Sequence, residues 1–403
     1  MPQHDARQVM RVALEPGDMS RLPSPSMHTA AADFHDARTR GASRDVSRAR
    51  ALALQHGWNA MAYQVVNDGI LHWFAAAGDA MVGYVRTHGV CLVVGAPICS
   101  GERLADVLAE WESFVRSIGC RACYFGAAGR LFDALDGQPG YTTVVLGAQP
   151  VWNPARWAEI PAGHASLRSQ LQRARNKGVT VTEWAPQRAE ADPRLQRCLQ
   201  QWLRTRGLPT LHFLVEPHTL HDLTGRRIFV AERAGEVVGF INASPVPARQ
   251  GWLVEQFVRG TGAPNGTIET LFDVMMRAVA ADGAAYVTMG LVPLREGTQQ
   301  PPDQNPAWLA ALLAFVRVHG RRFYNFRGLE RFKAKFRPHS WELIYAISAE
   351  PTFSLRTLYA IAAAFTVQSP VLAVSLGALR AVRIEIERLA RRVGPSRAAR
   401  AAP

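Results

Sequence analysis

The chain has 403 residues, of which 48% are hydrophobic, and it carries 46 Lys and Arg against 33 Asp and Glu, a net charge of +13. This length and apolar content exclude a disordered chain and predict a globular protein of two or three domains. The basic excess attracts phosphate-bearing partners such as RNA or anionic lipid without choosing between them, and an Arg-rich surface without such a partner is equally common.

The first 44 residues are expected to form a mobile lead-in. They carry Arg, Ser, Pro and His and lack the apolar stretch of a signal peptide. The chain has five cysteines, an odd number scattered over its length, which argues against a secreted disulfide framework. The cysteine pattern favours a reducing compartment.

Residues 45–162 are predicted to form one α/β unit. Residues 89–97 are an apolar, strand-like run, and Ser100 can cap a following helix that Gly119 ends. Further strands are expected over 121–127 and 141–147. The apolar residues on one face of the helix are Leu104, Val107, Leu108, Trp111, Val115 and Ile118.

Cys120 and Cys123 form a C-x-x-C pair at the start of an apolar run. No second pair and no His pair follows at the spacing of a zinc site. We therefore expect small core residues here rather than a redox or metal centre.

Residues 163–348 are predicted to form a second α/β unit. Helices are expected over 164–177 and 190–206, strands over 227–233, 237–244 and 252–258, a loop over 260–266, a helix over 267–281 and a strand over 285–290. Three antiparallel strands, a glycine-rich loop, a helix and a further strand are the order of a GNAT-like N-acyltransferase. The first unit is predicted to be a weaker copy of the same plan.

The loop before the helix in that fold offers backbone N–H groups to a pyrophosphate such as that of coenzyme A. The signature R/Q-x-x-G-x-G/A matches at Arg259 and Gly262 and fails at Pro264, whose ring removes one donor. This weakens, without excluding, an acyl-CoA- or acyl-carrier-dependent N-acyltransferase that makes an amino-acid lipid.

Six sequence blocks point to one family. They are Leu146–Pro150, Leu167–Gly178, Glu255–Arg259, Ala263–Thr267, Gly290–Leu294 and Phe323–Phe336. In content and order they resemble blocks of the phosphatidylglycerol lysyltransferase (aminoacyl-phosphatidylglycerol synthase) family, and the last block is the most specific. The resemblance covers roughly residues 60–348.

The resemblance implies an α/β (α+β) fold of two tandem GNAT-like domains with a C-terminal helical tail. It implies transfer of a lysyl or alanyl group from aminoacyl-tRNA to the hydroxyl of phosphatidylglycerol or a related anionic lipid. Such a transfer needs orientation, an acceptor for the hydroxyl proton and positive charge near the oxyanion, and it requires no covalent nucleophile, metal or cofactor. A non-catalytic RNA- or membrane-binding protein on the same fold is the alternative from another class.

Glu255 and Gln256 adjoin on a predicted strand, so their side chains are expected on opposite faces. The family typically has Asp where Gln256 stands, and Gln cannot act as a base. Glu255 is therefore the candidate general base or ammonium anchor, with a solvated strand residue as the alternative. Arg259 is the candidate to orient a phosphate or stabilise the oxyanion. Substrate-binding positions are expected at Gln256, Gly262 and Asn265.

The last block supplies the other candidates. Tyr324 and Arg327 as catalytic groups, with Asn325 binding substrate, could line the cleft, and a packed aromatic corner is the alternative. Lys333 and Lys335 share one face if that run is extended, which suits a lipid phosphate or the tRNA acceptor end. A solvated basic face is equally expected there.

The connecting helix is basic. Arg168, Arg173, Arg175 and Lys177 have no acidic residue among them, so they repel one another unless a polyanion or distant carboxylates compensate. This favours contact with tRNA or lipid phosphate.

Residues 349–403 are predicted to form a membrane-contacting tail. Residues 357–379 are uncharged and an Arg-rich segment follows, while Gln368, Ser369 and Pro370 interrupt the apolar run. Two short interfacial segments fit this pattern, with docking on the protein's own core as the alternative. The expected location is cytoplasmic, peripheral on the inner face of the cell membrane.

Overall fold

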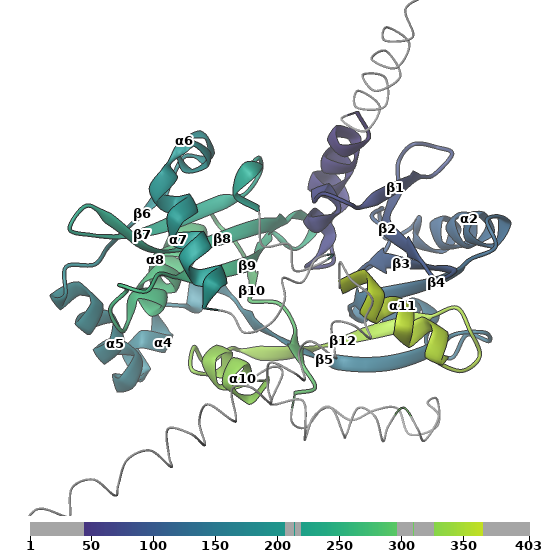
Figure 1. The fold of residues 1–403 in the computed structure, drawn as a ribbon. Helices are drawn as coiled ribbons and strands as arrows, with labels where there is room; N and C mark the ends of the chain where they lie inside the picture. Colours follow the sequence, from purple (N-terminus) through teal and green to yellow (C-terminus); the bar gives the residue numbers. More distant parts are fainter. Residues whose placement is uncertain (1–43, 206–212, 214–218, 296–308, 310–325, 366–403) are drawn as a thin grey trace, which may run out of the picture. The chain divides into compact units, whose positions relative to one another are not determined.

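The computed structural model describes residues 44–205, 213, 219–295, 309 and 326–365 (Figure 1). Tyr324 and Asn325 lie outside this range, as does the tail after Phe365. Helices and strands follow one another along the described chain, so the predicted α/β class is confirmed.

The first half contains three antiparallel strands, a helix, and a strand parallel to the third. It follows the plan predicted for it, and its last strand is longer than expected. Its elements are η1 (Ala62–Val66), β1 (Leu71–Phe74), β2 (Met81–Thr87), β3 (Val90–Val94), α2 (Leu104–Ser117), β4 (Arg121–Ala127), α3 (Gly129–Leu135) and β5 (Thr142–Trp152).

The second half repeats this plan with β7, β8, β9, α8 and β10. A connecting region of helices precedes it. The elements are α4 (Glu159–Gly163), α5 (Ala165–Asn176), β6 (Thr180–Trp184), α6 (Pro186–Ala191), α7 (Pro193–Arg204), β7 (Arg227–Arg233), β8 (Glu236–Val246), β9 (Gly251–Arg259), α8 (Thr267–Ala281), β10 (Tyr286–Thr288), β11 (Val292–Pro293), α10 (Phe326–Ala334), β12 (Ser340–Ser348) and α11 (Leu355–Phe365).

The two halves share one sheet because they exchange their last strands. The strand order is β1-β2-β3-β4-β12-β5-β10-β9-β8-β7-β6, and β11 pairs with β5. β5, from the first half, pairs with β10 of the second, while β12, from the end of the second half, pairs with β4 of the first. β5 and β12 also pair with each other along the whole of β12. Neither half therefore completes its part of the sheet with its own strands alone.

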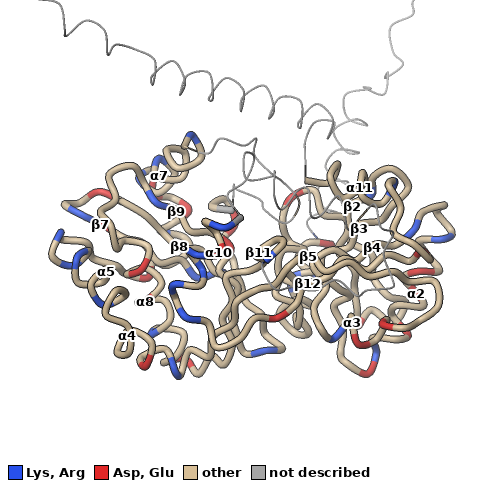
Figure 2. The backbone as a smooth tube through the Cα atoms, turned by 90° about the horizontal axis from the view of Figure 1, so that it is seen from below, with Lys and Arg blue, Asp and Glu red and all other residues tan. Residues whose placement is uncertain are grey.

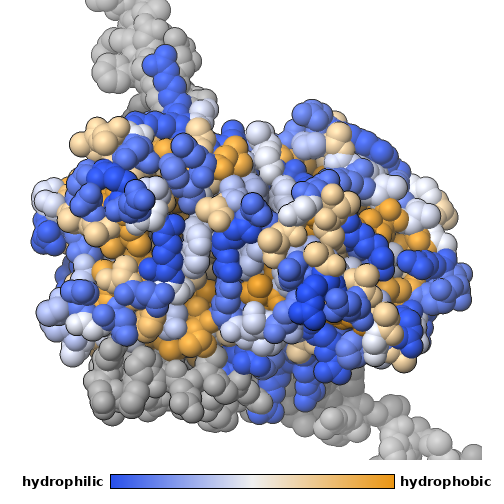
Figure 3. All heavy atoms as spheres, turned by 180° about the vertical axis from the view of Figure 1, so that it is seen from behind, coloured by the Kyte–Doolittle hydropathy of each residue, from blue (hydrophilic) through white to orange (hydrophobic). Residues whose placement is uncertain are grey.

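Each half has an apolar core between its strands and its long helix. In the first half Trp111 of α2 is fully buried and packs against Trp73 and Tyr84. In the second half Phe272 of α8 packs edge-on against Trp152 and Trp157. On the face drawn in Figure 3, hydrophilic residues are interspersed with smaller hydrophobic groups.

Two local expectations need correction or comment. Helix α2 begins at Leu104 and no side chain caps it, so Ser100 is not its cap. The cysteines are free, and burial of Cys123 in the core raises the pKa of its thiol, as suits a small core residue, whereas Cys120 is only half-buried.

Helix α11 covers the described part of the apolar run in the tail. Thr357 and Ala360 are fully buried, and Phe365 packs against Phe125 of β4, so one face of this helix docks on the first half. Among the residues that the structure describes, no helix combines the length and the apolar character needed to cross a bilayer.

Candidate active site

The parallel strands β9 and β10 separate after a short pairing. They are in register from Gly251 opposite Tyr286 to Leu253 opposite Thr288, where β10 ends, while β9 continues to Arg259. On its other edge, β9 pairs with β8, and the register shifts so that Glu255 has no counterpart on β8. Such a bulge interrupts the ladder and re-aims side chains, and bulges are common beside active sites.

A buried ion pair occupies the bulge. Glu255 Oε2 accepts from Nε of Arg226 at 3.0 Å and from Nδ2 of Asn242 at 3.3 Å, and the Arg226 and Glu255 side chains are only 2% and 4% exposed. Burial opposes the charged guanidinium, but the charge and hydrogen bond of Glu255 raise the pKa of Arg226 above its usual range. The guanidinium therefore keeps its charge although it is buried.

The other carboxylate oxygen is free to accept. Glu255 Oε1 is buried and has no hydrogen-bond partner among the described residues. A carboxyl oxygen held away from water without a hydrogen-bond donor is costly, and such groups mark places where a ligand donor completes the arrangement. The oxygen suits an ammonium or a hydroxyl donor.

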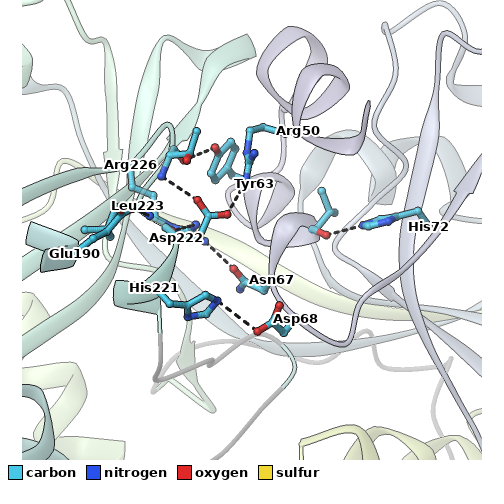
Figure 4. Close-up of polar contacts among 12 residues, drawn as sticks. Arg50, Tyr63, Asn67, Asp68, His72, Glu190, His221, Asp222, Leu223 and Arg226 are labelled. Atoms are coloured by element: carbon cyan, nitrogen blue, oxygen red, sulfur yellow. Dashed lines mark hydrogen bonds and ion pairs between the residues drawn. The ribbon is translucent and has the colours of Figure 1, made fainter. Parts of the chain in front are cut away.

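Arg226 is held from several sides. Its Nη2 donates to Asn67 Oδ1 at 2.7 Å and its Nη1 to the carbonyl of Asp222 at 3.0 Å. Asp222 in turn accepts from Arg50 at 2.5 Å, and the Tyr63 hydroxyl donates to the carbonyl of Thr224 at 2.5 Å. Figure 4 shows these side chains converging from the start of the first half and from the segment before β7.

Glycine is required at one point of this contact. Gly225 has φ +73°, and a Cβ there would lie 2.3 Å from the Tyr63 hydroxyl oxygen. The close approach lets the start of the first half fix the residue that orients Glu255.

Arg226, Asn242 and Asn67 were not among the predicted site residues. One signal was present, because Asn242 is a polar residue in an otherwise apolar strand and Asn is disfavoured there. Nothing in the sequence links Asn67 to Arg226, which lies 159 residues away.

The expected alternation of Glu255 and Gln256 was wrong. Asn242 lies directly opposite Gln256 in register, yet its side chain donates to Glu255. The bulge relaxes the strict alternation of a regular strand, and Gln256 is itself buried. A solvated position for Glu255 is also excluded by its 4% exposure.

Arg259 lies at the end of β9 and is exposed. Its Nη2 donates to the carbonyl of Ala263 at 2.9 Å and to Asn265 Oδ1 at 3.1 Å, so it fastens the loop that leads into α8. Four residues along a strand correspond to about 13 Å, so the structure does not bring Arg259 into contact with Glu255. Gly262 has open space around its Cα.

The expectation of an extended run at Lys333 and Lys335 was wrong, because Lys333 lies on helix α10 and Lys335 follows its end. Lys333 is buried, and its Nζ donates to the carbonyls of Met289, Gly290 and Leu291 at 2.7, 2.9 and 3.0 Å. It therefore fastens the segment after β10 instead of facing a phosphate.

Lys335 forms an ion pair with Glu269 of α8 at 2.6 Å and lies 4.4 Å from the ring centre of Phe332. Arg327 is exposed in the first turn of α10. Of the predicted corner of Tyr324, Asn325 and Arg327, only Arg327 is described.

The predicted basic helix is α5, and its basic positions are blue in Figure 2. Leu167, Leu171 and Ala174 form its buried face. Asp273 of α8 lies 3.8 Å from Arg175, and Arg168 donates to the carbonyl of Pro161. The four basic residues predicted here, Arg168, Arg173, Arg175 and Lys177, are all exposed.

Helix α5 packs closely on the loop before α8. Gly266 caps α8 with φ +97°, and a Cβ there would lie 2.1 Å from the carbonyl oxygen of Gln170. The backbone of α5 thus contacts Gly266, where a GNAT-like fold would offer N–H groups to a pyrophosphate. Pro264, two residues earlier, lacks such a group. Both features disfavour an acyl-CoA at this loop.

Comparisons with known proteins agree with this fold. Residues 49–348 match the family model described as phosphatidylglycerol lysyltransferase, C-terminal. A Bacillus subtilis phosphatidylglycerol lysyltransferase is 25% identical over 304 residues, which cover 74% of this chain and 34% of that protein. The chain spans less than two fifths of the length of the curated relatives it matches first.

Two solved structures share the fold. The structure of L-PGS from Bacillus licheniformis superposes with a TM-score of 0.64 at 20% identity, covering 84% of this chain and 97% of that one. A C-terminal domain from Agrobacterium fabrum gives a TM-score of 0.65 at 22% identity, with coverages of 77% and 92%.

Proposed function

The chain belongs to the phosphatidylglycerol lysyltransferase family, whose C-terminal region it matches, and from this premise we propose that it transfers an aminoacyl group from aminoacyl-tRNA to the hydroxyl of phosphatidylglycerol or a related anionic lipid. The match over residues 49–348 is the observation that carries the proposal. The group transferred is of the lysyl or alanyl class.

The reaction exchanges one ester for another. The lipid hydroxyl loses its proton and attacks the ester carbonyl of the aminoacyl-tRNA, and the ribose hydroxyl of the tRNA leaves with a proton. The protein must orient both substrates, provide a proton acceptor and stabilise the oxyanion.

Glu255 is the proposed polar anchor of this reaction. Its Oε1 lacks a partner among the described residues, so it can accept the ammonium of the aminoacyl group or the proton of the attacking hydroxyl. Arg226 and Asn242 both donate to Oε2, which leaves Oε1 as the oxygen directed to a substrate. Arg226 is thus a positioning residue that orients the carboxylate.

Phosphates are assigned to the exposed basic groups. Arg259 ends β9 and can turn to a phosphate at the cost of its loop contacts with Ala263 and Asn265. The exposed face of α5 presents Arg168, Arg173, Arg175 and Lys177 to the tRNA or to lipid headgroups. Such substrates meet at the inner face of the cell membrane, where we place the protein as a peripheral component.

A transfer assay tests the proposal. The full chain is incubated with radiolabelled lysyl- or alanyl-tRNA and liposomes that contain phosphatidylglycerol, and label is counted in the lipid phase. We expect label to enter the lipid, and we expect Glu255→Gln to reduce the rate about 100-fold or more. Glu236→Gln, at an exposed position at the start of β8, is the matched control and is expected to keep the full rate.

The other outcomes point to different functions. Transfer that requires acyl-CoA or an acyl carrier instead of aminoacyl-tRNA would replace the proposal by an N-acyltransferase. Binding of tRNA and liposomes without turnover would replace it by a non-catalytic binding protein.

A further inference from the structure

A cavity of about 590 Å³ lies in the first half, away from the β9–β10 divergence. Its walls are the end of α2, the start of β4, the segment after β12 and the start of α11. Cavities of this size hold small ligands or headgroups.

The charged lining combines three arginines with two glutamates: Arg116, Arg121, Arg356, Glu112 and Glu350. Both carboxylates are already engaged. Glu112 accepts from the hydroxyls of Tyr124 at 2.9 Å and Tyr141 at 2.7 Å, and its Oε2 lies 3.8 Å from Nη1 of Arg116, whose side chain is 68% exposed.

Glu350 fixes the base of the cavity. Its carboxylate accepts from Arg121, from the Ser348 hydroxyl at 2.9 Å and from the backbone N–H of Ser354 at 3.2 Å. Burial favours its neutral form, but the hydrogen bonds from Thr357, Ser354 and Ser348 prevail and lower the pKa of Glu350. The glutamate therefore stays ionised and holds Arg121 and the first turn of α11 in place.

Arg356 carries a positive charge and forms no ion pair with a carboxylate among the described residues. Its Nε donates to the carbonyl of His88 at 2.7 Å. Its guanidinium lies over Gly89, where a Cβ would be 1.9 Å from Nη2, and the His88 ring packs edge-on against Tyr359 at 4.7 Å. The turn between β2 and β3 thus holds Arg356 in position before any ligand arrives, which lowers the entropic cost of binding an anion.

An exposed apolar residue, Leu355, precedes Arg356 at the start of α11 and lies outside the lining of the cavity. Leu355 is 67% exposed, the highest fraction among the large hydrophobic residues described as exposed. Arginine beside an exposed leucine at the start of an apolar helix suits the boundary between lipid headgroups and acyl chains better than it suits a polynucleotide.

We propose that this cavity binds the phosphate-bearing headgroup of an anionic phospholipid, with Arg356 and Arg116 on the phosphate and Leu355 toward the acyl chains. The site is separate from Glu255 and docks the protein on the membrane. This proposal depends on the proposed function in one respect, namely that the acceptor of the transfer is a lipid of the membrane.

Vesicle binding tests the site without turnover. The full chain is floated with phosphatidylcholine vesicles that either contain or lack phosphatidylglycerol. The double variant Arg116→Gln with Arg356→Gln is expected to bind the anionic vesicles about 25-fold more weakly, at roughly fivefold for each basic residue at the surface. The matched control is Arg188→Gln with Arg197→Gln, exposed residues of α6 and α7, and its binding is expected to stay within about twofold of wild type.

Competition identifies the source of the phosphate. Soluble short-chain phosphatidylglycerol and glycerol 3-phosphate are expected to displace the protein from vesicles, and inorganic phosphate at equal ionic strength is expected to be ineffective. Displacement by inorganic phosphate as strong as by the short-chain lipid would overturn the lipid assignment. Leu355→Ser is expected to weaken vesicle binding several-fold and to leave glycerol 3-phosphate binding unchanged.

The result is independent of the transfer assay. Glu255→Gln is expected to float like wild type while losing transfer, so the two proposals fail separately. Equal binding by the Arg116 and Arg356 double variant and by the matched control, with both variants folded by circular dichroism, would remove the proposed site even if transfer is observed.

Discussion

The two halves of the molecule contain the same parallel strand pair, closed in one half and open in the other. β3 and β4 stay in register over five pairs, from Val90 opposite Arg121 to Val94 opposite Phe125, and all five residues of β3 are buried. β9 and β10 pair over three residues, after which β9 continues without β10, paired with β8 and with a bulge at Glu255. One plan thus serves as a rigid support in the first half and as a candidate site in the second.

The side chains differ in the same way. The residues of β3 are Val, Cys and Leu, which fill the pleated surface of a buried strand without needing partners. The open pair has Glu255 and Gln256 on β9, and Asn242 lies opposite Gln256 on β8; burying such polar groups lowers stability unless they are paired. Polar side chains and interrupted pairing thus occur at the same place in the second half, as expected where a substrate replaces the missing contacts.

The largest expected effect comes from breaking the Arg226–Glu255 pair. Glu255→Gln leaves the Arg226 charge buried without its partner and is expected to lower the free energy of unfolding by about 3 kcal/mol, in addition to the loss of transfer. The double variant Arg226→Met with Glu255→Leu is expected to regain most of the stability and none of the transfer. Urea denaturation and the lipid-phase assay measure the two quantities.

Such a result would show that the buried pair of the open half is needed for transfer and not for stability alone. If the apolar double variant transferred at the wild-type rate, the pair would be purely structural and the contrast would lose its functional meaning.

A smaller effect is expected where α5 meets the loop after β9. Gly266→Ala forces φ +97° on a residue with a side chain and directs a Cβ toward the Gln170 carbonyl, so we expect a loss of about 2 kcal/mol in the free energy of unfolding. Gly262→Ala, four residues earlier in the same loop and with no neighbour within 4 Å, is the matched control, with an expected change below about 1 kcal/mol. Equal losses in the two variants would show that the packing of α5 does not constrain this loop.

Much of the fold was readable from the sequence because it depends on local patterns. The strand Arg227–Arg233 and the helix Thr267–Ala281 have the predicted bounds, since alternation and helical periodicity are properties of short segments. The strand exchange between β5 and β12 was not predicted, because pairing partners almost 200 residues apart leave no periodic signal.

The candidate site was only partly readable for the same reason. Glu255 stood out as an acidic residue on a core strand, but its partner Arg226 and the bulge depend on register, which one sequence does not reveal. Lys333 was predicted to share one face of an extended run with Lys335, facing either a phosphate or solvent. Lys333 is buried because the run forms helix α10 and this position faces the protein. Basic residues at every second position look instead like one face of a strand, so the sequence did not show this.

The two halves use different donors for the backbone carbonyls at the end of the last parallel strand. Near the end of β4 the carbonyl of Gly126 accepts from the neutral, buried Asn59 side chain at 2.9 Å, whereas after β10 three carbonyls accept from Lys333. The carbonyls favour the charged ammonium, but burial lowers the pKa of Lys333 to about 7. The same lysine in the unfolded chain keeps its proton to about pH 10.4.

Between about pH 7 and pH 9 the unfolded chain therefore binds more protons than the folded one, and the contribution of Lys333 to stability rises with pH by at most about 1.4 kcal/mol per unit. Below about pH 6 both states are protonated and the contribution is constant. Urea denaturation of wild type and Lys333→Met across this range is expected to show a difference that grows with pH. Asn59→Ala, which removes the neutral fastening of the first half, is expected to give a constant difference. If the free energy of unfolding changed with pH in the same way in wild type and Lys333→Met, the carbonyls would outweigh burial and hold the Lys333 ammonium at its ordinary pKa. The contacts of Lys333 and Asn59 with backbone carbonyls would then differ in charge but not in their response to pH.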